Sequence, residues 1–288
     1  MWNWIKELFQ RNAQNYLYTP IPPERTDIAG DAAAIAPGER YIRIWLVQMA
    51  LKRDRSWFST WHPAVHCVVR LQFGDQPQVE IPYVAGPLNI PDLSDNNLDR
   101  VVHLNHQLTP LLPYAGGVVG LSAGLLAMQG DDQLKGFIDT LSSFSSLLNV
   151  PQLSATLKVA GPVASGVRNL VADADGDLHL GLQQSFTAAG GGGSNDLRPG
   201  YFAVVHATRD QVDPDQLRIE NDRLHLGDEP LGGHAFMLFR IEVREERDDY
   251  EGLTAIWGPW QKAVNELAKL DETTAETMLR LAIVSAFN

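Results

Sequence analysis

The chain contains almost no cysteine and is short of basic charge. Cys67 is the single cysteine in 288 residues, which excludes an internal disulfide framework. The first residues also lack the long apolar stretch and small-residue cleavage site of a secretory signal, so we expect a cytoplasmic protein. Lys and Arg number 23 against 35 Asp and Glu, giving a formal net charge of −12. Because binding to nucleic acid requires neutralising phosphates, nucleic acid is not an expected partner.

Motifs for phosphate and metal binding are missing as well. Neither G-x-x-x-x-G-K-[ST] nor G-x-G-x-x-G occurs, so no nucleotide or other cofactor is predicted. Several side chains are of the types that ligate metals, but their spacing matches no metal motif. These residues are His62, His66, Cys67, His103, His106, Asp173, Asp175 and Asp177. We therefore predict no metal site.

The chain does contain enough apolar surface to fold. Hydrophobic residues form 44% of it, which supports a sizeable core. Runs of β-branched and aromatic residues predict strands within 41–84 and 167–245, close enough in sequence to pair as antiparallel neighbours. Asn221-Asp222 predicts the tight turn of a hairpin in residues 217–226.

Helical spacing of apolar residues predicts helices before, between and after these strands. We therefore predict an α+β fold, in which a mainly antiparallel β-sheet system carries packed central helices (110–165) and a C-terminal helix pair. The expected units are an N-terminal amphipathic helix and extended linker (1–40), an α+β body (41–249) and the helix pair (250–288). The glycine run Gly190–Ser194 is either a natural loop or an added linker.

The central segment 109–130 is rich in glycine and carries no ionisable side chain except a tyrosine. Within it, Gly120-Leu121-Ser122-Ala123-Gly124 resembles the G-x-S-x-G nucleophile elbow of serine hydrolases, where a strand-to-helix turn exposes the serine to a histidine base. The resemblance implies Ser122 as the nucleophile. Its base would be one of four histidines: His179, His206, His225 or His234.

The same resemblance has a second part and two departures. Asp175-Gly176 is similar to the dyad aspartate of patatin-like lipases. The strands expected before the motif are antiparallel, however, and no glycine-rich oxyanion loop stands near the start of the chain. Both features depart from the hydrolase families.

Two other interpretations of this segment stay open. In one, Gly116, Gly120 and Gly124 form a ridge of small residues on a helix, as in membrane-embedded helix pairs. Segments 109–130 and 153–171 would then insert into a membrane after activation, as in a conditional pore-forming effector. In the other, which we favour, 109–130 is a glycine- and alanine-rich helix buried against the sheet.

The leading functional hypothesis is a non-enzymatic interaction or effector protein with a protein partner. Its expected docking elements are the C-terminal helix pair and an aromatic N-terminal helix. The N-terminal helix presents Trp2, Trp4, Ile5 and Phe9.

Overall fold

The computed structural model describes ten stretches of the chain, and all structural statements below refer to them. They are residues 16–27, 33–38, 40–52, 61–71, 79–85, 101–109, 111–114, 116–129, 177–188 and 196–246. Several predicted features lie outside the described residues: the N-terminal helix with Trp2, Trp4, Ile5 and Phe9, the part of the predicted helical range at 130–165, segment 153–171, Asp175-Gly176, the run Gly190–Ser194 and the C-terminal helix pair.

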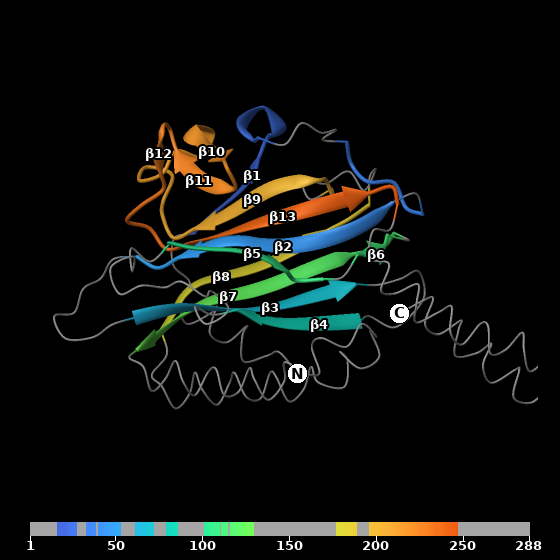
Figure 1. The fold of residues 1–288 in the computed structure, drawn as a ribbon, viewed down its shortest axis with the longest axis horizontal. Helices are drawn as coiled ribbons and strands as arrows, with labels where there is room; N and C mark the ends of the chain where they lie inside the picture. The colour runs from blue at the N-terminus through green and yellow to red at the C-terminus, as the bar shows by residue number, and fades with distance from the viewer. Residues whose placement is uncertain are drawn as a thin grey trace, which may run out of the picture.

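Antiparallel strands form one six-stranded sheet, which we call sheet A (Figure 1). In spatial order its strands are β1 (Leu17–Ile21), β9 (Gly200–Val205), β13 (Phe236–Arg244), β2 (Tyr41–Ala50) and β5 (Val101–Gln107), while the short β6 (Leu112–Pro113) also pairs with β2. The segments that meet at the centre of this sheet are therefore distant in sequence.

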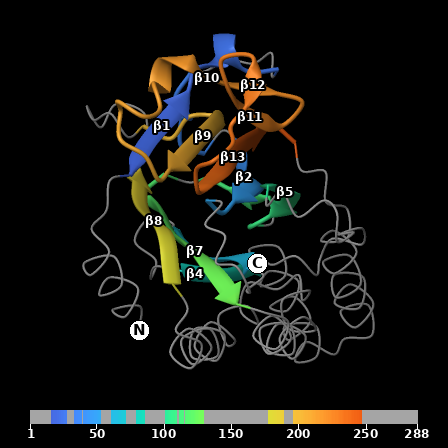
Figure 2. The same cartoon turned by 90° about the vertical axis from the view of Figure 1, so that its left-hand side faces the viewer.

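A second antiparallel sheet, sheet B, has four strands. They are β4 (Val79–Ala85), β3 (Trp61–Leu71), β7 (Val119–Gln129) and β8 (Asp177–Phe186), in that order. A small three-stranded sheet consists of β10 (Leu217–Glu220), β11 (Arg223–Leu226) and β12 (Glu229–Pro230). Figures 1 and 2 show three layers, with sheet A between the small sheet and sheet B.

The main hydrophobic core lies between sheets A and B. Alternate residues of β2, such as Ile42 and Ile44, pack with alternate residues of β7, such as Leu121 and Leu125, because successive side chains of a strand point to opposite faces. Aromatic rings add to this core, since Phe202 stacks on Phe239 with 5.2 Å between ring centroids.

A second core lies on the opposite face of sheet A. Val205, Phe236 and Leu238 of sheet A pack there against Leu217 and Leu224 of the small sheet. Buried Gln48 joins the two layers, because its Oε1 accepts a hydrogen bond from the Leu224 amide at 3.0 Å. The central strands of sheet A are thus covered on both faces.

The expected α+β fold with packed central helices is wrong for the part of the chain that the structure describes. Helix there is limited to the three-residue 3₁₀ turns η1 (Pro23–Arg25) and η3 (Pro214–Gln216). Residues 119–129, inside the range 110–165 predicted to be helical, form β7. None of the described helices is long and apolar enough to cross a membrane.

Burial on both faces explains the error at β7. Its residues from Val119 to Ala127 are buried throughout, on the core face and on the outer face alike. A strand that is buried on both faces does not alternate between apolar and polar residues, and its sequence is a continuous uncharged segment. The periodicity of such a segment does not distinguish a strand from a buried helix. Pairing with neighbouring strands makes this segment a strand, because β7 pairs along its length with β3 and β8.

The strands with clear alternation or turn signals agree better with expectation. The hairpin at 217–226 is confirmed, and Asn221 and Asp222 adopt positive φ angles of 52° and 57° in its turn. By contrast, the N-terminal unit expected as a helix and an extended linker (1–40) includes edge strand β1, and strand β5 was not expected.

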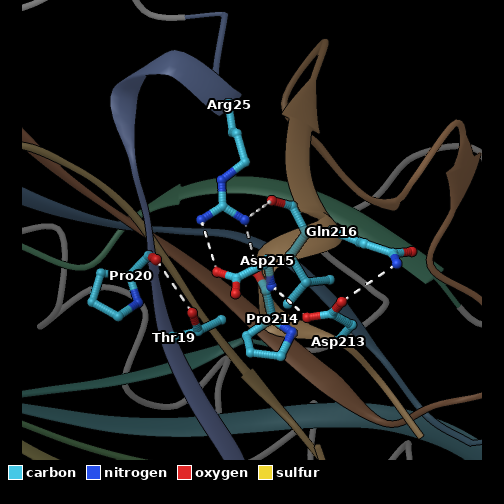
Figure 3. Close-up of polar contacts among 8 residues, drawn as sticks. Thr19, Pro20, Arg25, Asp213, Pro214, Asp215 and Gln216 are labelled. Carbon is cyan, nitrogen blue, oxygen red and sulfur yellow. Dashed lines mark hydrogen bonds and ion pairs between the residues drawn. The ribbon is translucent and has the colours of Figure 1, made fainter. Parts of the chain in front are cut away.

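An arginine fastens the N-terminal arm to the loop that leads into the small sheet (Figure 3). Arg25 Nη1 donates hydrogen bonds to the carbonyl oxygens of Pro214 (2.9 Å) and Leu217 (3.3 Å), and Nη2 lies 3.6 Å from Asp215 Oδ1. The side chain of Asp213 caps η3 by accepting from the Asp215 amide at 3.0 Å. The positively charged Arg25 thereby provides hydrogen bonds to carbonyl groups of this turn, as basic groups do at helix ends.

Replacing Arg25 with Ala should lower the free energy of unfolding by about 1.5–3 kcal/mol, because hydrogen bonds from a charged group are lost. Urea unfolding followed by tryptophan fluorescence measures this change. The exposed Arg209 provides the matched control, and its replacement by Ala should change stability by less than about 0.5 kcal/mol. Equal losses in the two variants would contradict the contact's role.

Candidate functional site

Ser122 lies in the middle of β7, on the face of sheet B that points away from sheet A. It pairs with Val68 of β3 and Gln183 of β8, and it is 4% exposed. Its Oγ accepts a hydrogen bond of 2.7 Å from Arg70 Nη1. A guanidinium is a donor that stays protonated in proteins, so Arg70 does not act as a base toward Ser122.

The geometry of a nucleophile elbow is not present around Ser122. Residues 120–124 continue one strand, where the motif requires a turn from strand to helix. Three of the expected bases belong to the sheet A side of the main core: His206 follows β9, His225 lies in β11 and His234 precedes β13. The structure therefore does not bring them to Ser122, and the reactivity of this serine stays a prediction.

The three glycines expected on one helical ridge have separate roles. Gly116 is a turn residue with a φ of 99°, and a Cβ there would lie 3.2 Å from Pro37 Cβ. Gly120 pairs with Arg70, and a Cβ there would meet Arg70 Cβ at 3.3 Å. Gly124 pairs with His66 on one side and Gly181 on the other. Small residues on β7 thus make room for large polar side chains on β3.

His66 is the histidine closest to Ser122 in the strand register, and the sequence prediction did not include it among the possible bases. It lies two positions from Val68, the residue opposite Ser122, and is buried. Burial penalises the charged imidazolium and lowers the His66 pKa to about 4. The imidazole is therefore neutral at physiological pH.

The stronger candidate for a functional surface lies on sheet A, on the face that also carries the small sheet. Tyr201, Arg240 and Trp45 form one row across β9, β13 and β2, and Glu242 and Arg43 form the next row across β13 and β2. We call these five residues the arginine–aromatic face. The sequence prediction did not include any of them as site residues.

Trp45 is held between two arginines. The guanidinium carbon of Arg240 lies 5.1 Å from the centroid of the Trp45 ring, and that of Arg43 lies 5.6 Å from it. Both distances are in the range of cation–π attraction. The indole of Trp45 is partly exposed, so this stack reaches the surface.

Glu242 neutralises one end of the face. Its Oε2 accepts from Trp45 Nε1 at 2.7 Å and lies 3.6 Å from Arg43 Nη1, while its Oε1 accepts from Arg244 Nε at 2.6 Å. Two arginines and the indole thus share one largely buried carboxylate. This network fixes the orientation of the Trp45 ring, as buried polar networks do when their members are satisfied.

The other end of the face touches the tip of the β10–β11 hairpin. Asp222 accepts a hydrogen bond from the Tyr201 hydroxyl and a longer one, 3.4 Å, from Asn105 Nδ2. Arg240 Nη1 lies 3.8 Å from Asp222 Oδ1 and its guanidinium lies 6.0 Å from the Tyr201 ring centroid. Burial, followed by the contact with Asp222, raises the pKa of Tyr201, so the phenol stays protonated and donates.

This arrangement is suited to recognition. It offers the partly exposed indole of Trp45 and the partly exposed guanidinium of Arg240, side-chain types enriched at the centres of protein interfaces, while Tyr201 and Arg43 are buried beside them. No group of three or more His, Cys, Asp or Glu side chains among the described residues could hold a metal ion.

Fold and site together define a layered antiparallel β protein with a polar–aromatic face on its central sheet. Comparison of the chain with protein families, with curated proteins and with solved structures finds no match.

Native protein should not react with a fluorophosphonate probe at Ser122, because the hydroxyl is buried in a strand and its hydrogen-bond donor is an arginine. Mass spectrometry of the treated protein, beside the Ser122→Ala variant, measures this. An adduct on the native protein that the variant lacks would show that Ser122 is a nucleophile.

The depressed pKa of His66 should make stability depend on pH. The unfolded state takes up a proton near pH 6.5 and the folded state only near pH 4, so stability is full above pH 6.5 and is lost as the pH falls toward 4. Between pH 7.5 and 5.0, urea unfolding should show a loss about 2 kcal/mol larger in the wild type than in His66→Gln. The same loss in both proteins would exclude His66 as the cause.

Proposed function

We propose that this chain is a non-enzymatic interaction protein and that the arginine–aromatic face contacts a protein partner. The observation that carries the proposal is the partly exposed indole of Trp45, held between the guanidinium groups of Arg43 and Arg240. Tryptophan and arginine provide much of the binding energy at protein interfaces, because they bury large surfaces while keeping directed polar contacts.

Preorganisation strengthens this proposal. Strand pairing fixes the backbone positions of the row Tyr201–Arg240–Trp45, and Glu242 fixes the ring of Trp45. A partner that binds such a surface loses little free energy to ordering its side chains. Exposed Gln107 of β5 pairs with Trp45 and extends the row toward the edge of sheet A.

Two further parts of the proposal rest on the sequence alone. The aromatic N-terminal helix and the helix pair at 250–288 are additional docking elements. A cytoplasmic location follows from the chain's single cysteine, which allows no internal disulfide.

Site-specific photo-crosslinking tests the proposal in the cells that naturally produce the protein. With p-benzoylphenylalanine in place of Gln107, irradiation should give a covalent adduct with one protein of defined mass. The matched control carries the same group in place of Gln183, an exposed glutamine of β8 on sheet B, and should not give this adduct. Adding Arg240→Gln should reduce the Gln107 adduct at least tenfold, as for loss of a central interface contact worth about 1.5–3 kcal/mol.

The crosslinking has two outcomes that contradict the proposal. If neither position gives an adduct, the face does not contact a partner in the cell. If both positions give the same adducts, contact is not specific to the arginine–aromatic face.

A further inference from the structure

Arg240 retains hydrogen-bonding capacity that the described residues do not use. Its Nε is buried and has no hydrogen-bond partner there, and its ion pair with Asp222 spans 3.8 Å. A guanidinium has five N–H donors, and hydrogen-bonded pairs with a carboxylate have N···O distances of about 2.7–2.9 Å. The side chain as a whole is 22% exposed, so a ligand would reach the guanidinium through its terminal nitrogens and not through the buried Nε.

The surroundings of Arg240 hold its guanidinium ready for a planar anion. The guanidinium carbon lies 5.1 Å from the Trp45 ring centroid and 6.0 Å from that of Tyr201, and the guanidinium also contacts the Tyr201 hydroxyl. Arg43 and Arg244 share the carboxylate of Glu242. Arg240 is therefore the arginine of this surface with the least carboxylate contact.

Charge selects the class of partner. Three arginines, Arg43, Arg240 and Arg244, share this surface with the carboxylates of Glu242 and Asp222, whereas the whole chain has a net charge of −12. Asp27, which accepts from the Asn221 amide, adds a third carboxylate at the hairpin tip. The net charge of the molecule repels an acidic segment, so a carboxylate of such a segment would bind where a guanidinium is accessible, at Arg240. Two carboxylates bound to the same guanidinium repel each other, so a ligand carboxylate would compete with Asp222 for Arg240.

The position of Asp222 indicates that its ion pair with Arg240 is weak. It lies at a hairpin tip, is 36% exposed, and makes its closest contact with the Tyr201 hydroxyl. Exposed ion pairs of this length contribute little to stability. The Asp222 carboxylate thus lies next to Arg240, where the carboxylate of an acidic ligand would bind.

We infer that the partner surface is an acidic protein segment, that a carboxylate of this segment binds the Arg240 guanidinium, and that Asp222 opposes this binding. The inference rests on the proposed function and adds to it the chemistry of the partner. It also assigns Arg240 as the residue that selects for acidic segments.

Fluorescence anisotropy with a labelled octaglutamate peptide tests the inference at low and at physiological ionic strength. Wild-type protein should bind saturably, and more weakly as salt rises. The Asp222→Asn variant should bind the peptide roughly fivefold more tightly, because it lacks a negative charge that repels the peptide next to the guanidinium. Asparagine keeps an acceptor for Tyr201 and tolerates the positive φ, so the hairpin turn is preserved.

Two arginine variants separate a specific site from general attraction. Arg240→Gln should weaken binding by about tenfold or more, since hydrogen bonds to a charged group are lost. Arg209→Gln removes the same charge from an exposed loop beyond the opposite end of β9 and should change the affinity less than about twofold. Protection of the buried Cys67 thiol against a thiol reagent reports that each variant is folded. Asp222→Ser replaces Asp222→Asn if the latter fails this check.

Three results would overturn the inference. They are no octaglutamate binding by folded wild type, no gain in affinity in the folded Asp222 variant, or equal losses in Arg240→Gln and Arg209→Gln. If peptide binding fails while the Gln107 crosslink forms, the interaction function stands and the acidic partner is wrong. If the peptide binds as expected but no crosslink forms, carboxylate recognition stands and the cellular interaction is contradicted.

Discussion

Coverage of sheet A on both faces is the constraint on which the rest of the structure depends. One face packs on sheet B through Ile44 and Phe239, and much of the other packs on the small sheet through Val205 and Leu238. Under the small sheet, the polar Gln48 of β2 is buried and hydrogen-bonded to Leu224, whereas larger charged side chains lie at the hairpin tip. The arginine–aromatic face lies in this place, next to the tip of the β10–β11 hairpin.

The β10–β11 hairpin consequently has two roles. Its apolar residues, including Leu217 and Leu224, complete the second core, and its turn brings Asp222 to Tyr201 and Arg240. Since Arg25 ties the preceding turn to the N-terminal arm, the position of Asp222 depends on packing and on contacts far along the chain. The charge next to Arg240 is thus set by the same packing that covers sheet A.

Sheet B shows how burial changes the meaning of a motif. Gly120, Ser122 and Gly124 lie at alternate positions of one strand, where the glycines face Arg70 and His66 and the serine hydroxyl bonds to Arg70. The same residue types at a strand-to-helix turn would present a nucleophile. Spacing in sequence is identical in the two cases, so the surrounding backbone decides the chemistry.

The sequence by itself determined the local features: strands rich in β-branched and aromatic residues, such as 41–49, and the hairpin turn at Asn221-Asp222, whose positive φ angles suit those residues. It did not determine β7, because this strand is buried on both faces and consists mainly of Gly, Ala and Leu, so neither alternation nor β-branched residues mark it. Only the tertiary structure brought Trp45, Tyr201 and Arg240 together. These residues are up to 195 positions apart, and their proximity arises from strand pairing between distant segments, which no local pattern records.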